Sequence, residues 1–120
     1  MAHTELDNKS TGQLVKRFEE LAKIHRALET PEKANRAFDE QIKVWAELKR
    51  RGSESVALFL GLLRSPEPAV RLNSASLALF VAPSEAEAVL EELTKQPKLL
   101  GLSAAMTLRQ WRAGELKPLA

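Results

Sequence analysis

Breaks that contain proline or glycine divide this chain of 120 residues into short segments, and this division most constrains its fold. Between the breaks, apolar residues recur every three to four positions, which is the spacing of one helix face. Alanine, leucine, glutamate, lysine and arginine are abundant in these segments, and all five favour helices. The period-two alternation that would predict strands is hard to find anywhere. The chain is therefore predicted to be all-α.

The sequence predicts six helices. The first begins near Ser10, which can form a capping box with Gln13. The second begins after Thr30, with Pro31 in its favoured first position, and ends in three basic residues followed by Gly52. The other four helices are predicted over residues 53–64, 68–82, 85–94 and 98–112, the last of them ending at Gly114.

Two details of the later helices are also predicted. Ser53 or Ser55 is expected to cap the third helix. Gly61 and Gly101 fall inside predicted helices, where the lack of a side chain would allow close helix packing.

Six helices with short breaks predict three antiparallel hairpins. Residues 71–80 (RLNSASLALF) resemble residues 100–109 (LGLSAAMTLR) at a spacing of about thirty residues, as expected for a helical repeat. The segment 68–82 is apolar almost all round, so a middle position with neighbours on both sides is expected. Arg71 at its start is expected to reach turn carbonyls, or the carboxylate of Glu54 or Glu67.

The stretch LGLLRSPEPAVRLNSASLALF resembles a HEAT repeat, with a leucine-rich helix, a proline turn, a Val-Arg step and a second helix of small residues and leucine. The chain from Leu14 to Pro118 also resembles a bacterial family of small HEAT-like proteins known only as a domain of unknown function. The matching segments are Leu14–Ala22, Lys49–Gly52, Val70–Phe80 and Met106–Trp111, with Lys117-Pro118.

This resemblance implies an α-α superhelix of three stacked antiparallel helical hairpins, of the HEAT/armadillo-like type. It brings no catalytic residue with it. HEAT-like scaffolds mostly bind other macromolecules, so the fold implies, by analogy alone, a non-enzymatic binding module or small scaffold.

Length and composition add further bounds. One domain is predicted over residues 10–114, between a disordered tail at 1–9 and a C-terminal tail at 115–120. The absence of cysteine excludes disulfides and thiolate metal sites. The first ten residues do not read as a signal or transit peptide, and the longest apolar run, VALFLGLL, is too short to span a bilayer. A cytoplasmic protein without membrane contact is expected.

Candidate chemistry is sparse, and no enzyme, metal site or cofactor is predicted. His25 is in phase with the apolar face of the first helix and is interpreted as a partly buried core residue, while His3 lies in the tail. The basic run Lys49-Arg50-Arg51 could bind phosphate, but such a run more often completes a helix C-terminus.

Another protein is the expected partner, and an inhibitor or immunity-type protein is one role that such a binding module could have. The residues proposed for the contact surface are Arg36, Lys43, Asn73, Arg109 and Trp111. Trp111 is expected to fold back on Leu108 and Leu116, or else to anchor a partner or a weak homodimer. Nucleic acid is the alternative partner, bound by an arginine-bearing concave face with Arg64, Arg71, Arg109 and Arg112. The net charge of only +2 argues against it.

Overall fold

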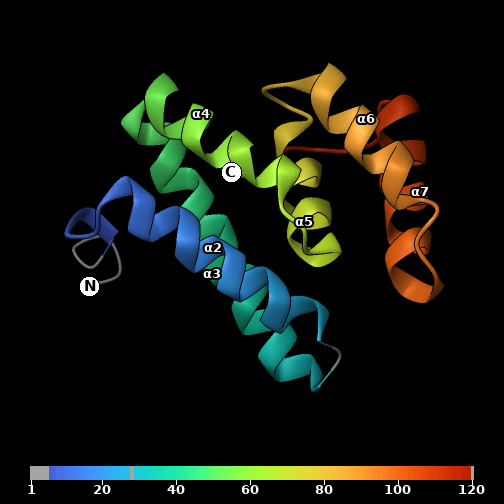
Figure 1. The fold of residues 1–120 in the computed structure, drawn as a ribbon, viewed down its shortest axis with the longest axis horizontal. Helices are drawn as coiled ribbons and strands as arrows, with labels where there is room; N and C mark the ends of the chain where they lie inside the picture. The colour runs from blue at the N-terminus through green and yellow to red at the C-terminus, as the bar shows by residue number, and fades with distance from the viewer. Residues whose placement is uncertain (1–5, 28, 120) are drawn as a thin grey trace. The chain divides into compact units, whose positions relative to one another are not determined.

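The computed structural model describes residues 6–27 and 29–119, which contain helices and no strand. This part of the chain divides into two compact units, one up to Gly61 and one over residues 62–119. The α-helices are α2 (Thr11–Arg26), α3 (Pro31–Arg51), α4 (Ser53–Leu60), α5 (Pro68–Ala78), α6 (Pro83–Leu93) and α7 (Lys98–Arg112); a 3-10 turn, η1 (Gly61–Arg64), follows α4 (Figure 1). The all-α prediction is confirmed.

Local signals position the two long helices of the first unit. The Ser10 hydroxyl accepts a bond from the Gln13 backbone amide at 3.1 Å, and the Gln13 side chain accepts one from the Ser10 amide at 2.8 Å, as the capping box predicts. Thr30 caps α3 through the Lys33 amide at 3.2 Å. Gly52, with φ of 109°, ends α3 in a conformation that side chains rarely adopt.

An aromatic core holds the first unit together. Helix α2 lies along α3, and α4 packs against both helices (Figure 1). The ring of Phe59 from α4 lies 4.9 Å from that of Phe18 on α2, edge to face, and 4.4 Å from that of Trp45 on α3. All three side chains are buried, so one aromatic cluster joins the three helices.

The second unit has an aliphatic core instead. Its helices α5, α6 and α7 all contact one another. The buried apolar side chains are Val70, Leu72, Ala75, Leu77, Ala78, Leu79, Ala86, Leu90, Leu93, Ala104 and Leu108, together with Leu62 and Leu63 of η1. Arg71 donates from Nη1 to the Ser65 carbonyl at 2.7 Å, which confirms that this arginine reaches the turn before its own helix.

Some predicted boundaries need correction. The helix predicted over residues 53–64 tightens into η1 at Gly61. Helix α5 ends at Ala78 rather than Ala82, because the amides of Phe80 and Val81 bond three residues back instead of four. Helix α6 begins two residues early, with Pro83 at its first position.

The two predictions about glycines have opposite outcomes. A Cβ at Gly101 would clash with the carbonyl oxygens of Gln96 and Thr94, so this glycine does allow the turn before α7 to pack closely. A Cβ at Gly61 would meet nothing within 4 Å, so close packing is not its role. The predicted serine cap of α4 is also wrong: Gly52 occupies that position without a side-chain bond, and Ser55 is buried.

Two of the predicted hairpins fall within single units. Helices α2 and α3 pair in the first unit, and α6 and α7 pair in the second. The third, α4 with α5, has one helix in each unit, so the stacked arrangement stays a prediction, as does the single domain. No helix in the described part of the chain is long and apolar enough to cross a membrane.

Candidate protein-binding surface

Helix α7 carries apolar side chains on two opposite faces. Ala104 and Leu108 are buried against the second unit. The other face carries Leu99, Leu102 and Met106, which are 54%, 55% and 50% exposed. Their spacing of three and then four residues puts them in one row along the helix. We call this row the α7 stripe. Three large apolar residues in one exposed row are typical of a contact surface, whereas single ones need no explanation.

Basic residues flank the α7 stripe at its two ends. Lys98 is the first residue of α7, with a φ of 61°, and Arg109 follows about three helical turns later. Neither forms an ion pair within residues 6–27 and 29–119. Helix α7 contains no aspartate or glutamate. The stripe therefore combines apolar contact area with a positive charge at each end.

The third cation of α7 is already neutralised. Arg112 forms ion pairs with Glu91 at 2.8 Å and Glu87 at 3.4 Å, both on α6. These contacts join the two helices at the C-terminal end of α7. Arg112 is consequently less available to a partner than Lys98 or Arg109.

Trp111 has contacts outside its own helix. Its Nε1 donates to Glu87 Oε2 at 3.2 Å, and its ring meets that of Phe80 edge to face at 5.3 Å. The side chain is half-buried, while Phe80 is 36% exposed. These contacts join α7 to α6 and to the end of α5. Part of the Trp111 side chain stays exposed.

The other predicted contact residues are divided between the units. Arg36 and Lys43 are exposed, seven residues apart on α3, so they share one side of that helix. Asn73 is only 7% exposed and is removed from the candidate surface. It lies on α5 in an unbroken run of buried residues from 72 to 75.

A groove of about 410 Å³ opens beside Arg36 in the first unit. Leu21, Ile24 and Ala37 form its apolar lining. Its charged rim is largely paired: Arg17 holds Glu40 through two bonds of 2.8 and 3.0 Å, and Lys33 holds Glu29 at 2.8 Å. This internal pairing leaves the groove with little charge to offer a ligand.

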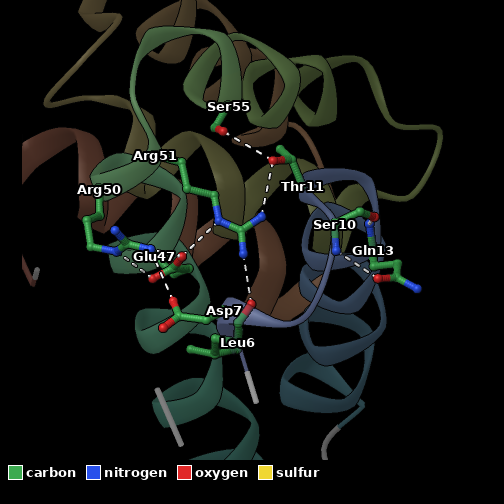
Figure 2. Close-up of polar contacts among 9 residues, drawn as sticks. All are labelled: Leu6, Asp7, Ser10, Thr11, Gln13, Glu47, Arg50, Arg51 and Ser55. Atoms are coloured by element: carbon green, nitrogen blue, oxygen red, sulfur yellow. Dashed lines mark hydrogen bonds and ion pairs between the residues drawn. The ribbon is translucent and has the colours of Figure 1, made fainter. Parts of the chain in front are cut away.

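The basic run at the end of α3 is engaged with the protein itself, as Figure 2 shows. Arg50 bonds Glu47 through Nε at 2.9 Å and Nη2 at 2.6 Å, and Arg51 Nε bonds the same carboxylate at 2.8 Å. Lys49 lies over the Trp45 ring, 5.4 Å from its centroid. The interpretation that this run completes a helix C-terminus is confirmed, because all three cations have partners within the first unit.

The same network ties the start of the described chain to α3 (Figure 2). Arg51 Nη2 donates to the Leu6 carbonyl at 2.8 Å, and Arg50 Nη2 reaches Asp7 at 3.1 Å. Hydrogen bonds from Arg50 and then Arg51 lower the pKa of Glu47 from 4.5 to about 2. Glu47, which is 6% exposed, is therefore a buried anion at the centre of a structural network.

His25 is half-buried beside Phe38, with the two ring centroids 5.2 Å apart. Burial, and then the charge of Arg26, lowers the pKa of His25 from 6.5 to about 4, so the imidazole is neutral at neutral pH. Within the described residues, no group of three or more His, Cys, Asp or Glu side chains is arranged to hold a metal ion.

The sequence interpretation missed the α7 stripe and the role of Glu47. The stripe had a signal, because residues 99, 102 and 106 follow helical spacing out of phase with 104 and 108. Glu47 had a weaker signal in the sequence, because it precedes two arginines by three and four residues, a spacing that allows helical ion pairs.

Comparisons with known proteins agree on one family. The family model described as "Domain of unknown function (DUF2019)" matches residues 12–111. The crystal structure of the protein RPA1889 from Rhodopseudomonas palustris CGA009 is 30% identical in sequence, with a TM-score of 0.83. The alignment covers 94% of this chain and 97% of that one. No curated protein matches the chain.

Proposed function

This chain belongs to the DUF2019 family of unknown function, and we propose that this member is a non-enzymatic protein-binding module. The single observation that carries the proposal is the α7 stripe. Leu99, Leu102 and Met106 each keep about half of their surface exposed although α7 already has a buried face. Helix α7 therefore has a second apolar face in contact with solvent. Removing such a face from water by binding another protein is energetically favourable.

Residue types at and near the stripe also support a protein partner. Met106 has a flexible side chain that adapts to irregular apolar surfaces. Arginine and tryptophan are enriched where interface energy concentrates, and Arg109 and the partly exposed Trp111 lie at the same end of the helix. A protein of this kind, small and bearing one contact face, suits an inhibitor or immunity-type role in the cytoplasm.

The proposed architecture is a short HEAT-like superhelix of three stacked hairpins. The pairing of α2 with α3, and of α6 with α7, supports it.

Nucleic acid is the less favoured partner. Of the four arginines that could form a basic face, Arg71 donates to the Ser65 carbonyl and Arg112 is paired with two glutamates. Phosphate binding needs several available cations on one surface. Arg64 and Arg109 remain exposed, which is few for that purpose.

Affinity capture from the native cell lysate, treated with nuclease, tests the proposal. Three baits are compared by quantitative mass spectrometry: the wild type, Leu102→Asp, and Leu58→Asp. Leu58 is a matched control, because it is 49% exposed on α4 in the first unit. A protein retained by the wild type and by Leu58→Asp, but lost from Leu102→Asp, is the expected result.

Two other outcomes contradict the proposal. Capture that disappears after nuclease treatment would favour the nucleic-acid alternative. A set of proteins that does not differ between the Leu102 and Leu58 variants would show that the α7 stripe is not a contact surface.

A further inference from the structure

We propose that the α7 stripe binds an acidic amphipathic helix of another protein, an inference that rests on the proposed function and names the kind of partner. The apolar row gives the geometry. Leu99, Leu102 and Met106 extend over seven residues, about 10 Å or two helical turns. A partner helix with apolar residues at the same spacing would place its own row against this one, in the usual manner of packed helices.

Charge decides which helix fits. Lys98 and Arg109 flank the stripe at its two ends, and no described carboxylate forms an ion pair with either. Helix α6 shows the chemistry that neutralises such cations, because its Glu87 and Glu91 pair with Arg112. A partner helix with glutamate or aspartate beside its apolar row would do the same for Lys98 and Arg109. Such complementarity selects partners and accelerates their encounter.

The same charges argue against a second copy of this chain as the occupant. In an antiparallel pair of α7 helices related by a two-fold axis, the start of each helix lies beside the end of the other. Lys98 of one copy would then approach Arg109 of the other. Helix α7 has no acidic residue with which to offset the repulsion. A heterologous acidic helix avoids this conflict.

The test uses two synthetic peptides and the full chain. Both peptides are amphipathic helices of roughly 18 residues, five turns, with the same apolar row. One carries glutamate at the positions that flank the row, and the other carries lysine. Binding is followed by fluorescence anisotropy of labelled peptide. At low salt the acidic peptide should bind at least about tenfold more tightly than the basic one, and the difference should shrink at high salt.

Matched variants assign the effect to the stripe. Leu102→Asp should abolish binding of the acidic peptide, while Leu58→Asp should leave it unchanged. The double variant Lys98→Glu/Arg109→Glu should reverse the preference between the peptides. Lys16→Glu/Lys23→Glu changes the net charge equally, on exposed residues of α2 in the first unit, and should keep the original preference. Circular dichroism confirms that each variant is folded.

Each contrary result has a distinct meaning. Equal binding of both peptides, lost in Leu102→Asp, would leave the proposed function intact and overturn the acidic partner. If both double variants reversed the preference between the two peptides, that preference would depend only on the net charge of the protein, and the inference would be overturned. Failure of both peptides to bind would also overturn it, and lysate capture would still test the proposed function. A dimer in sedimentation that Leu102→Asp abolishes would make a second copy the occupant.

Discussion

The two units of this protein are stabilised by different means. The first joins its three helices through the ring cluster of Phe18, Trp45 and Phe59, caps α2 and α3 with side chains, and buries the Glu47 carboxylate between arginines. In the second unit the core is aliphatic, and α5, α6 and α7 start without a side-chain cap bond.

Exposed apolar residues follow the same division. Ile24 and Leu58 are exposed in the first unit. The second unit exposes Phe80, Val81, Leu99, Leu102, Met106 and Leu119. The second unit, whose α-helices start without side-chain caps, thus also exposes more of the large apolar residues in the described part of the chain. Under the proposed function, this contrast teaches that stability and recognition are assigned to different parts of a short chain.

The two tryptophans allow the contrast to be measured, because Trp45 lies in the first unit and Trp111 in the second. Phe59→Ala removes the ring shared by α2, α3 and α4, and should lower the free energy of unfolding by about 3–5 kcal/mol. Urea unfolding followed by Trp45 fluorescence in a Trp111→Phe background measures it.

The matched change in the second unit is Leu90→Ala, on a buried residue of α6. It should cost about 2–4 kcal/mol, because a leucine loses less buried surface than a phenylalanine. Trp111 fluorescence in a Trp45→Phe background measures this loss in the free energy of unfolding. An equal or larger loss than that of Phe59→Ala would contradict the difference between the two cores.

A glycine pair tests close packing in the second unit. Gly101→Ala should destabilise the protein by about 1–3 kcal/mol, because the new methyl group meets the carbonyls of Gln96 and Thr94. Gly61→Ala is the control, since its Cβ has open space, and should change stability by less than about 0.5 kcal/mol. Thermal unfolding compares the two. Equal effects would mean that the turn before α7 relaxes around the added group.

Glu47→Gln tests the buried anion of the first unit and should cost about 1–2 kcal/mol at neutral pH. Glu87→Gln should cost less than about 1 kcal/mol, because Glu87 is more exposed than Glu47. Urea unfolding at neutral pH measures both. A larger loss for Glu87→Gln would place the stronger ionic contact in the second unit.

The pH dependence gives an independent check on Glu47. Its folded pKa of about 2 lies below the ordinary 4.5, so its contribution is present above pH 4.5 and is lost as the pH falls toward 2. The free energy of unfolding of the wild type should therefore fall more steeply in this range than that of Glu47→Gln. Urea unfolding at a series of pH values measures the two slopes, and parallel slopes would contradict the lowered pKa.

Helix caps should produce the smallest effects. Ser10→Ala removes the hydroxyl that accepts from the Gln13 amide, one of the two bonds of the capping box, and should lower stability by about 1 kcal/mol. Glu67→Asp places a shorter acceptor at the uncapped start of α5 and should raise stability by about 0.5 kcal/mol. Thermal unfolding of both variants measures the changes. No gain from Glu67→Asp would mean that the start of α5 is already satisfied by other groups.

The sequence by itself determined the parts of this protein that depend on neighbouring residues. The helix starts at Ser10 and Thr30, the end of α3 at Gly52 and the extent of α7 follow from caps, proline and glycine, whose effects act within a few residues. Family resemblance was readable for the same reason, since its motifs are short segments.

Some residues have equivalent sequence patterns, and only the tertiary structure decided which of them are buried. Gly61 and Gly101 look alike in the sequence, yet only Gly101 has carbonyls packed against it. Asn73 looked as available as Lys43 but is buried, and Trp111 contacts Phe80 and Glu87, two contacts that the sequence did not predict. Both faces of α7 are apolar, and packing against α5 and α6 covers one of them. Burial depends on contacts between residues far apart in the chain, and local periodicity does not specify those contacts.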